Sequence, residues 1–175
     1  MSYSIICGTN RNKNATQYVA KIYQSIIESK RISVSYLGME ELPHDFVFKN
    51  EVFGDASPDF QKAIEKHIDT AEKIIIVSPE YNGSMPGALK AFIDGIKPAH
   101  FQNKKICLVG VASGRYGNLR GMDHLTGIFH HLGCHILPQK IAVTAIDKIL
   151  NDQKQITDER TLHFINTQID QFIAF

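Results

Sequence analysis

Nearly uninterrupted apolar runs alternate with helix-like patterns along this chain, and this alternation limits its fold more than any other feature. Residues 74–77 read Ile-Ile-Ile-Val, and residues 105–112 read Lys-Ile-Cys-Leu-Val-Gly-Val-Ala. Strands that are apolar on both faces are typical of parallel sheets that helices cover on both sides. The chain is therefore expected to form an α/β structure in three layers, with the sheet in the middle.

Strands and helices are expected in strict alternation. The strands are predicted at residues 3–7, 32–37, 74–77, 105–112 and 134–143, the last broken by Pro138. The helices are predicted from about residue 15, from Pro58 with Ser57 as N-cap, over residues 88–96, from Leu119 to a C-terminal Gly133, and after Thr157 as a cap. Residues 39–59 show no clear period and are expected to form a long connection. These βα units predict a flavodoxin-like α/β/α sandwich with a five-stranded parallel sheet in the order 2-1-3-4-5.

The bulk composition is that of an ordinary globular protein. The chain has 175 residues, of which 43% are hydrophobic and 21% charged, and its formal net charge is +1. A chain of this length can bury one substantial core, so residues 1–175 are expected to form a single domain. The balanced charge argues against a protein dedicated to nucleic acids or membrane surfaces. No signal-peptide pattern or membrane-spanning run is found, so a cytoplasmic location is expected.

A loop of unusual composition follows the strand at residues 74–77. Residues 78–87 read Ser-Pro-Glu-Tyr-Asn-Gly-Ser-Met-Pro-Gly. The two prolines limit the flexibility of this loop, Gly83 and Gly87 allow its backbone to approach a ligand, and Tyr81 supplies a flat ring. Glu80 could serve as an acid or base, but a role in holding the loop or capping the next helix is favoured. The loop suits a planar, polar ligand.

A second polar loop, residues 8–14, precedes the first helix and contains Arg11. A helix N-terminus with short polar side chains and an arginine can bind phosphate, although an ordinary capped loop has a similar composition. Gly8 is its only glycine, so the loop is neither a dinucleotide fingerprint nor a P-loop, and a monophosphate fits better than a pyrophosphate. Both loops are expected at the switch point between strands 1 and 3, where this fold binds ligands.

The cysteines raise one alternative for the first loop. Cys7, Cys107 and Cys134 form no C-x-x-C pair, and buried thiols without a disulfide are expected. Cys7 could instead belong to the anion cradle of a low-molecular-weight cysteine phosphatase. That pattern needs an arginine six positions after the cysteine, where this chain has Lys13, and lysine does not form a bidentate clamp. The phosphatase alternative is therefore disfavoured.

The eight histidines do not form a metal-binding pattern, although four lie within a short stretch, His124, His130, His131 and His135. Adjacent His130 and His131 point in different directions on a helix, and Gly133 interrupts the span to His135. No cysteine or carboxylate stands at ligand spacing. Exposed histidines and no bound metal are expected.

Three motifs resemble those of the NADPH-dependent FMN reductase family, which includes quinone reductases and related azo- and chromate-reducing flavoproteins. Residues 78–90 resemble its signature P-E-Y-N-x-S-x-P-G-x-L-K, and residues 8–11, Gly-Thr-Asn-Arg, are similar to its G-S-x-R. Residues 113–120, Ser-Gly-Arg-Tyr-Gly-Asn-Leu-Arg, resemble its glycine-rich segment before a helix. The motifs stand in the family's order and span nearly the whole chain.

The resemblance implies a flavodoxin-like fold that binds FMN without a covalent bond. The residues implied to hold the phosphate are Thr9, Arg11, Asn14, Ala15 and Thr16. Those implied to line the isoalloxazine are Pro79, Glu80, Tyr81, Asn82 and Gly83, with Ser113, Gly114 and Gly117 near its other end. The chain departs from the family at four positions. The family often has serine where this chain has Thr9 and Asn14, asparagine where it has Thr16, and a second glycine where it has Asn118.

The implied activity is hydride transfer from NADPH, or NADH, through FMN to a small acceptor such as a quinone, an azo compound or a free flavin. The flavin would carry this chemistry, so no catalytic side chain is required. Backbone N–H groups of residues 81–83 would stabilise negative charge on the reduced flavin. The family also implies a homodimer or homotetramer.

Two alternatives stay open at this point. One is a flavodoxin-like electron carrier that exchanges electrons with proteins and never meets a nicotinamide. Flavodoxins usually have a threonine-rich, uncharged phosphate loop and an acidic surface, whereas this chain has Arg11 and a near-neutral charge. The other is a flavin-binding or flavin-sensing module without useful turnover.

Overall fold

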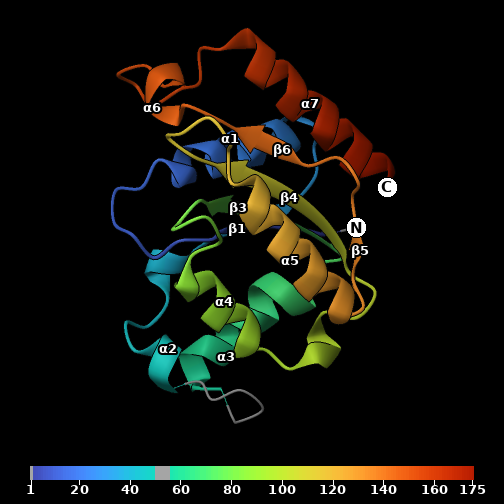
Figure 1. The fold of residues 1–175 in the computed structure, drawn as a ribbon. Coiled ribbons are helices and arrows are strands. Elements are labelled where there is room, and N and C mark those ends of the chain that lie inside the picture. Colours follow the sequence, from blue (N-terminus) through green and yellow to red (C-terminus); the bar gives the residue numbers. More distant parts are fainter. Residues whose placement is uncertain (1, 50–55) are drawn as a thin grey trace.

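A twisted parallel sheet runs through the middle of the molecule (Figure 1). The structure is a computed structural model that describes residues 2–49 and 56–175. Its strands are β1 (Tyr3–Cys7), β2 (Val34–Gly38), β3 (Lys73–Pro79), β4 (Lys105–Val111), β5 (His135–Ile136) and β6 (Ile141–Val143). They are ordered β2-β1-β3-β4-β5, with β6 also paired to β4. The predicted order 2-1-3-4-5 is confirmed, and β2 lies at the predicted edge.

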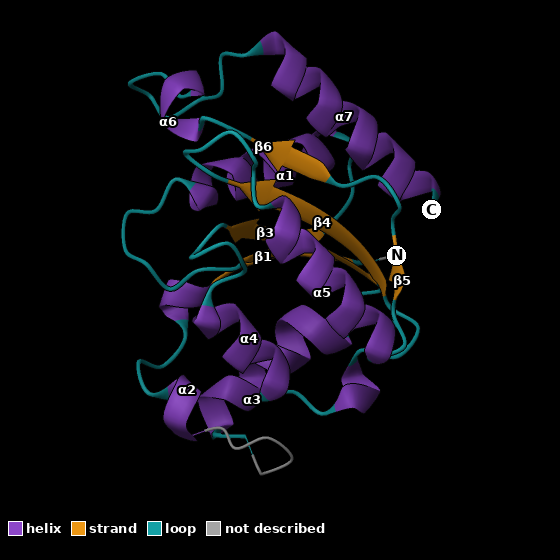
Figure 2. Ribbon diagram, in the orientation of Figure 1, coloured by secondary structure: helices purple, strands orange, loops and turns teal. Residues whose placement is uncertain are grey.

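Helices cover both faces of this sheet (Figure 2). One face carries α1 (Thr16–Ser29) and α7 (Glu159–Ala174), and the other carries α3 (Pro58–Ile64), α4 (Gly87–Asp94) and α5 (Leu119–His131). The shorter elements are η1 (Met39–Glu41), α2 (Phe46–Lys49), the π-helical turn η2 (Glu65–Asp69), η3 (Pro98–His100) and α6 (Ile146–Ile149). The three-layer α/β/α sandwich is therefore confirmed.

Each central strand contributes side chains to two apolar cores. On β3, Ile75 and Val77 belong to the core beneath α1 and α7, whereas Ile74 and Ile76 belong to the core beneath α3, α4 and α5. All four are at most 2% exposed. Burial on both faces requires apolar residues at every position, which is why the strand is continuous in hydrophobicity rather than alternating.

The strand register brings the predicted ligand loops to one edge of the sheet. Cys7 at the end of β1 pairs with Val77 of β3, and Pro79 at the end of β3 pairs with Val111 of β4. Because these strands are parallel, the chain leaves all three in the same direction. The loops after β1, β3 and β4 therefore meet.

The predicted fifth strand is divided into two short strands. Residues on either side of Pro138 form β5 and β6, and both pair in parallel with β4. Proline has no N–H to donate to a ladder, so the break falls where the sequence predicted it. The sheet thus has six strands rather than five.

Element ends follow the sequence signals with one correction. Ser57 is the N-cap of α3 with Pro58 as its first residue, and Gly133 follows α5 with φ +76°, as predicted. The cap of α7 is Asp158 rather than Thr157, because the Asp158 carboxylate accepts the Thr161 N–H at 2.8 Å.

The predicted long connection carries short helices, η1 and α2, for which no sequence period was visible. Residues 50–55 of that connection lie outside the described residues. Within residues 2–49 and 56–175, no helix has the length and apolar character needed to cross a membrane.

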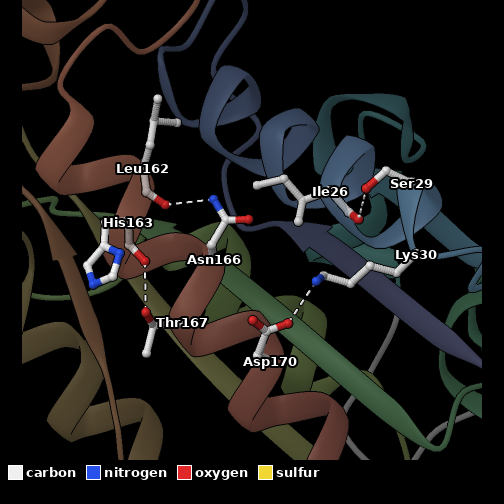
Figure 3. A network of polar contacts seen from close by, with 8 residues as sticks. All are labelled: Ile26, Ser29, Lys30, Leu162, His163, Asn166, Thr167 and Asp170. Carbon is white, nitrogen blue, oxygen red and sulfur yellow. Dashed lines mark hydrogen bonds and ion pairs between the residues drawn. The ribbon is translucent and has the colours of Figure 1, made fainter.

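Helix α7 packs beside α1, and polar side chains lie along the contact between the two helices (Figure 3). Lys30, which directly follows α1, and Asp170 of α7 form an ion pair at 2.8 Å, but their side chains are 34% and 63% exposed, so the pair contributes little stability. The buried contacts matter more. Phe172 is 1% exposed, and the buried Tyr23 hydroxyl donates to Gln168 Oε1.

Candidate functional site

A cleft of about 310 Å³ lies at the sheet edge where the three loops meet. It brings together eight of the residues predicted to hold a flavin: Arg11, Asn14, Ala15, Thr16, Pro79, Glu80, Tyr81 and Ser113. These residues come from three segments that are far apart in the sequence. A cleft therefore lies at the switch point, where the site is predicted.

One end of the cleft carries groups that can bind an anion. Arg11 and Lys13 line it with exposed side chains. The backbone N–H groups of residues 12–16 donate to no other group in the described part of the chain, and Lys13 adopts a left-handed backbone with φ +52°. Free N–H groups around such a residue, at the start of α1, form a concave anion site. A phosphate fits the donors that are present.

The buried side chain of Asn14 fixes the conformation of this loop. Its Oδ1 accepts the Gln17 N–H at 2.8 Å, and its Nδ2 donates to the Arg11 carbonyl at 2.7 Å. Asn14 is 5% exposed. The side chain therefore satisfies one N–H in the first turn of α1 and holds the loop, and the backbone N–H of Asn14 stays free for a ligand.

Thr9 does not line the cleft but connects two of the loops. It is fully buried, and its hydroxyl forms a 2.8 Å hydrogen bond with the Tyr81 hydroxyl. The same oxygen accepts the Arg11 N–H at 3.2 Å. Thr9 thus links the anion end of the cleft to the loop after β3.

Residues 81–84 form a tight hairpin turn. Tyr81 N–H donates to the Ser84 carbonyl at 2.9 Å, and Ser84 N–H returns a bond to the Tyr81 carbonyl at 3.0 Å. Asn82 and Gly83 have φ +51° and +75°, as a type I′ turn requires. They occupy the tip of the turn and do not line the cleft. The N–H groups of residues 81–83 are the three predicted donors, and the turn itself uses that of Tyr81. Within the described residues, the N–H groups of Asn82 and Gly83 stay free.

Glu80 is held at both its backbone and its side chain. Its N–H donates to the Val111 carbonyl of β4 at 3.0 Å, and its carboxylate accepts the Asn118 N–H at 3.2 Å. Glu80 also lines a second cleft of about 250 Å³, together with Tyr116, Leu119 and Arg120. These contacts support the predicted organising role of Glu80, which stands where the two clefts adjoin.

The glycines of the third loop lie away from the first cleft. Gly117 has φ +55°, and a Cβ added there would stand 2.5 Å from Ala142 Cβ on β6. Its lack of a side chain therefore lets the loop pack on β6. A Cβ on Gly114 would meet open space. Their predicted contacts with a flavin ring stay predictions.

Sequence reasoning missed five lining residues: Lys13, Val111, Ala112, Ile146 and Asp147. Val111 and Ala112 directly precede the predicted Ser113, so the end of the buried strand was a usable signal. Ile146 and Asp147 belong to α6, which no motif marks. They reach the cleft because β6 pairs with β4 beside it.

The buried cysteines are not nucleophiles at neutral pH. Burial raises the pKa of the Cys7 thiol to about 12, so it stays protonated, and its Sγ contacts Asn14 Oδ1 at 3.6 Å. Cys107 and Cys134 are also buried and free, as predicted. This further disfavours the cysteine phosphatase alternative.

The four clustered histidines are exposed as predicted, namely His124, His130, His131 and His135, but the prediction is wrong for His67, which is buried. Across residues 2–49 and 56–175, no three or more histidine, cysteine, aspartate or glutamate side chains gather in a way that could hold a metal ion.

Comparisons with known proteins agree with this geometry. Residues 1–147 match the family model for NADPH-dependent FMN reductases. A 2-hydroxy-1,4-benzoquinone reductase from a Burkholderia species is 23% identical in an alignment 180 residues long that covers 100% of this chain and 96% of the relative.

Two solved structures confirm the flavodoxin-like fold. FerB, a flavoenzyme NAD(P)H:(acceptor) oxidoreductase from Paracoccus denitrificans, has a TM-score of 0.80 at 22% identity, over 99% of this chain and 95% of FerB. A flavodoxin from the domain Archaea has a TM-score of 0.67 at 15% identity, over 99% of this chain and 98% of the flavodoxin. Since the family match extends from the first strand into α6 and includes every loop of the cleft, this chain belongs to the NADPH-dependent FMN reductase family.

Proposed function

We propose that this protein is an oxidoreductase that binds FMN and transfers hydride equivalents from NADPH or NADH to a small acceptor such as a quinone. The observation that carries the proposal is the cleft of about 310 Å³, which joins a cationic loop to the family's signature loop. Family membership supports the flavin and the nicotinamide. The name of the Burkholderia relative, a benzoquinone reductase, supports a quinone as acceptor, and that of FerB, an NAD(P)H:(acceptor) oxidoreductase, supports a reduced nicotinamide as donor.

The residues present fit FMN along the whole cleft. Arg11, Lys13 and the free N–H groups of residues 12–16 would hold the phosphate. Ser113 and Asp147 offer polar groups for the hydroxyls of the ribityl chain. Pro79 and Tyr81, together with Glu80 between them, would lie beside the ring.

Bound FMN supplies the hydride chemistry, so the protein contributes binding and orientation. Tyr81 is held by Thr9, and Glu80 is held by β4 and by the start of α5, so the walls beside the ring are set before a ligand arrives. Asn82 and Gly83 keep free N–H groups in the hairpin turn, and these would be available to stabilise negative charge on a reduced flavin. No side chain is required to exchange a proton.

The second cleft is the position we propose for the acceptor or the nicotinamide. Tyr116 and Leu119 are 66% and 49% exposed there, which is unusual for large apolar side chains. They offer a flat apolar surface, and Arg120 adds a positive charge. The cleft adjoins the first one through Glu80, so a molecule in it would lie next to the flavin ring.

Turnover of the FMN-loaded protein tests this function. We expect NADPH oxidation that depends on added 1,4-benzoquinone, disappears when FMN is stripped and returns when FMN is restored. An FMN-loaded protein that oxidises neither NADPH nor NADH with a quinone, an azo compound or free flavin would refute the proposal.

We also propose that residues 1–175 form a single FMN-binding domain that assembles as a homodimer or homotetramer in the cytoplasm. The two apolar cores share one sheet, which supports a single domain. Exposed Tyr116 and Leu119 beside the cleft support assembly there. Sedimentation of the purified protein and fractionation of cells test the assembly and the location.

A further inference from the structure

Asn118, immediately before α5, makes contacts that a helix cap does not need. It is fully buried and has φ +63°. Its side-chain Nδ2 lies 3.1 Å from the Ser78 carbonyl, 3.2 Å from the Ser78 hydroxyl and 2.9 Å from the Pro79 carbonyl, all at the end of β3. The amide thus donates across the gap between two strand-terminal loops.

The side-chain amide of Asn118 lies between the end of β3 and the first turn of α5, but it does not cap that helix. An asparagine at this position usually accepts an N–H from the first turn, but here its oxygen makes no such bond. Asn118 Oδ1 is buried without a partner in the described chain, close to Gly121, where an added Cβ would lie 2.1 Å away. Exchanging oxygen and nitrogen would aim Oδ1 at two carbonyls, so the donor must face β3. The orientation serves β3 rather than α5.

The backbone of Asn118 extends the same connection to the next residue. Its N–H donates to Glu80 Oε2 at 3.2 Å. Asn118 therefore contacts three consecutive residues, Ser78, Pro79 and Glu80, of which the last two line the first cleft and Glu80 lines both clefts. Asn118 itself lines neither cleft.

We propose that Asn118 is a positioning residue for the flavin ring, acting through Pro79 and Glu80. This inference rests on the proposed FMN site. A left-handed backbone favours glycine or asparagine, and of the two only asparagine carries a donor for the β3 carbonyls. Glycine would keep the backbone, with its N–H to Glu80, and lose the side-chain donor to β3. Aspartate would keep the shape but aim an oxygen at two carbonyls.

The variants Asn118→Gly and Asn118→Asp test the inference, with Asn103→Gly as the matched control. Asn103 has the same φ of +63°, but it is exposed in the turn before β4 and makes no side-chain hydrogen bond in the described chain. FMN and riboflavin affinities are measured by quenching of flavin fluorescence, at a temperature where circular dichroism shows each variant folded. The visible circular dichroism of the bound flavin reports the ring environment.

A ring-side role predicts equal losses for the two flavins, because riboflavin has the same ring but no phosphate. Asn118→Gly should weaken both by about ten-fold, the scale of one or two neutral hydrogen bonds, and should change the visible circular dichroism. Asn118→Asp should weaken both at least as much, and it is the deciding variant if Asn118→Gly does not fold. Asn103→Gly should match the wild type.

Two results would overturn the inference. One is wild-type affinity and an unchanged visible spectrum in the folded Asn118 variants. The other is a loss confined to FMN, which would place the effect at the phosphate. If the wild-type protein binds neither flavin, both the proposed function and this inference fail. If the wild type binds flavin and the Asn118 variants bind it equally well, only this inference fails.

Discussion

Acidification from pH 7 to pH 5 should destabilise the folded protein through His67. This side chain is 4% exposed, and its Nδ1 lies 3.1 Å from the Ser35 hydroxyl of β2. Burial, with a smaller contribution from the neighbouring Lys66, lowers the pKa of His67 from 6.5 to about 4. The folded state therefore keeps a neutral imidazole at pH 5, where the unfolded chain carries a proton.

The sign and size of the effect follow from proton linkage. Between pH 6.5 and about 4 the unfolded state binds more protons, so stability falls as the pH falls through that window and the loss is complete below it. Each pH unit within the window corresponds to about 1.4 kcal/mol. From pH 7 to pH 5, His67 should therefore remove about 2 kcal/mol from the free energy of unfolding.

Urea unfolding at the two pH values isolates this contribution. The FMN-free protein is compared with His67→Gln, which has no imidazole at this position. Between pH 7 and pH 5 the wild type should lose about 2 kcal/mol more than the variant. The exposed His163→Gln serves as control and should follow the wild type. The reasoning is refuted if His67→Gln loses as much stability as the wild type.

Two further predictions concern the cleft and its surroundings. Arg11→Ala should weaken FMN binding by about 10- to 100-fold, the scale of a charge-assisted contact, and should leave riboflavin binding unchanged. Fluorescence titrations measure both affinities, and equal losses for the two flavins would contradict a phosphate role for Arg11. Gly117→Ala should cost about 2 kcal/mol or more in urea unfolding, because the added Cβ stands 2.5 Å from Ala142 Cβ on a left-handed backbone. Gly114→Ala, which meets open space, is its control, and equal stabilities would count against the packing role of Gly117.

The sheet was predictable because burial on both faces leaves little choice of residue. Ile74 and Ile76 face one core and Ile75 and Val77 the other, so the strand is visible as an apolar run. The strand order and the meeting of the loops follow from connecting such strands in parallel. The division of the last strand was likewise visible in Pro138.

The parts that sequence reasoning missed depend on contacts between distant segments. Asp147 reaches the cleft only because β6 pairs with β4, and a single aspartate carries no local sign of that. Asp158 and Thr157 are both good helix caps, and which one caps α7 is decided by backbone geometry. In the sequence, Asn118 is visible only as a residue that replaces a glycine of the family. Its hydrogen bonds to β3 could not be predicted without knowing that β3 lies beside it.

The central claim is that this chain presents an FMN to a reduced nicotinamide. Anaerobic mixing of the FMN-loaded protein with NADPH, followed by visible absorbance, tests it most directly. We expect full bleaching of the flavin band at a rate that matches or exceeds turnover with a quinone. A spectrum that stays unchanged with NADPH and NADH, in a protein whose flavin dithionite readily bleaches, would contradict it and favour an electron carrier.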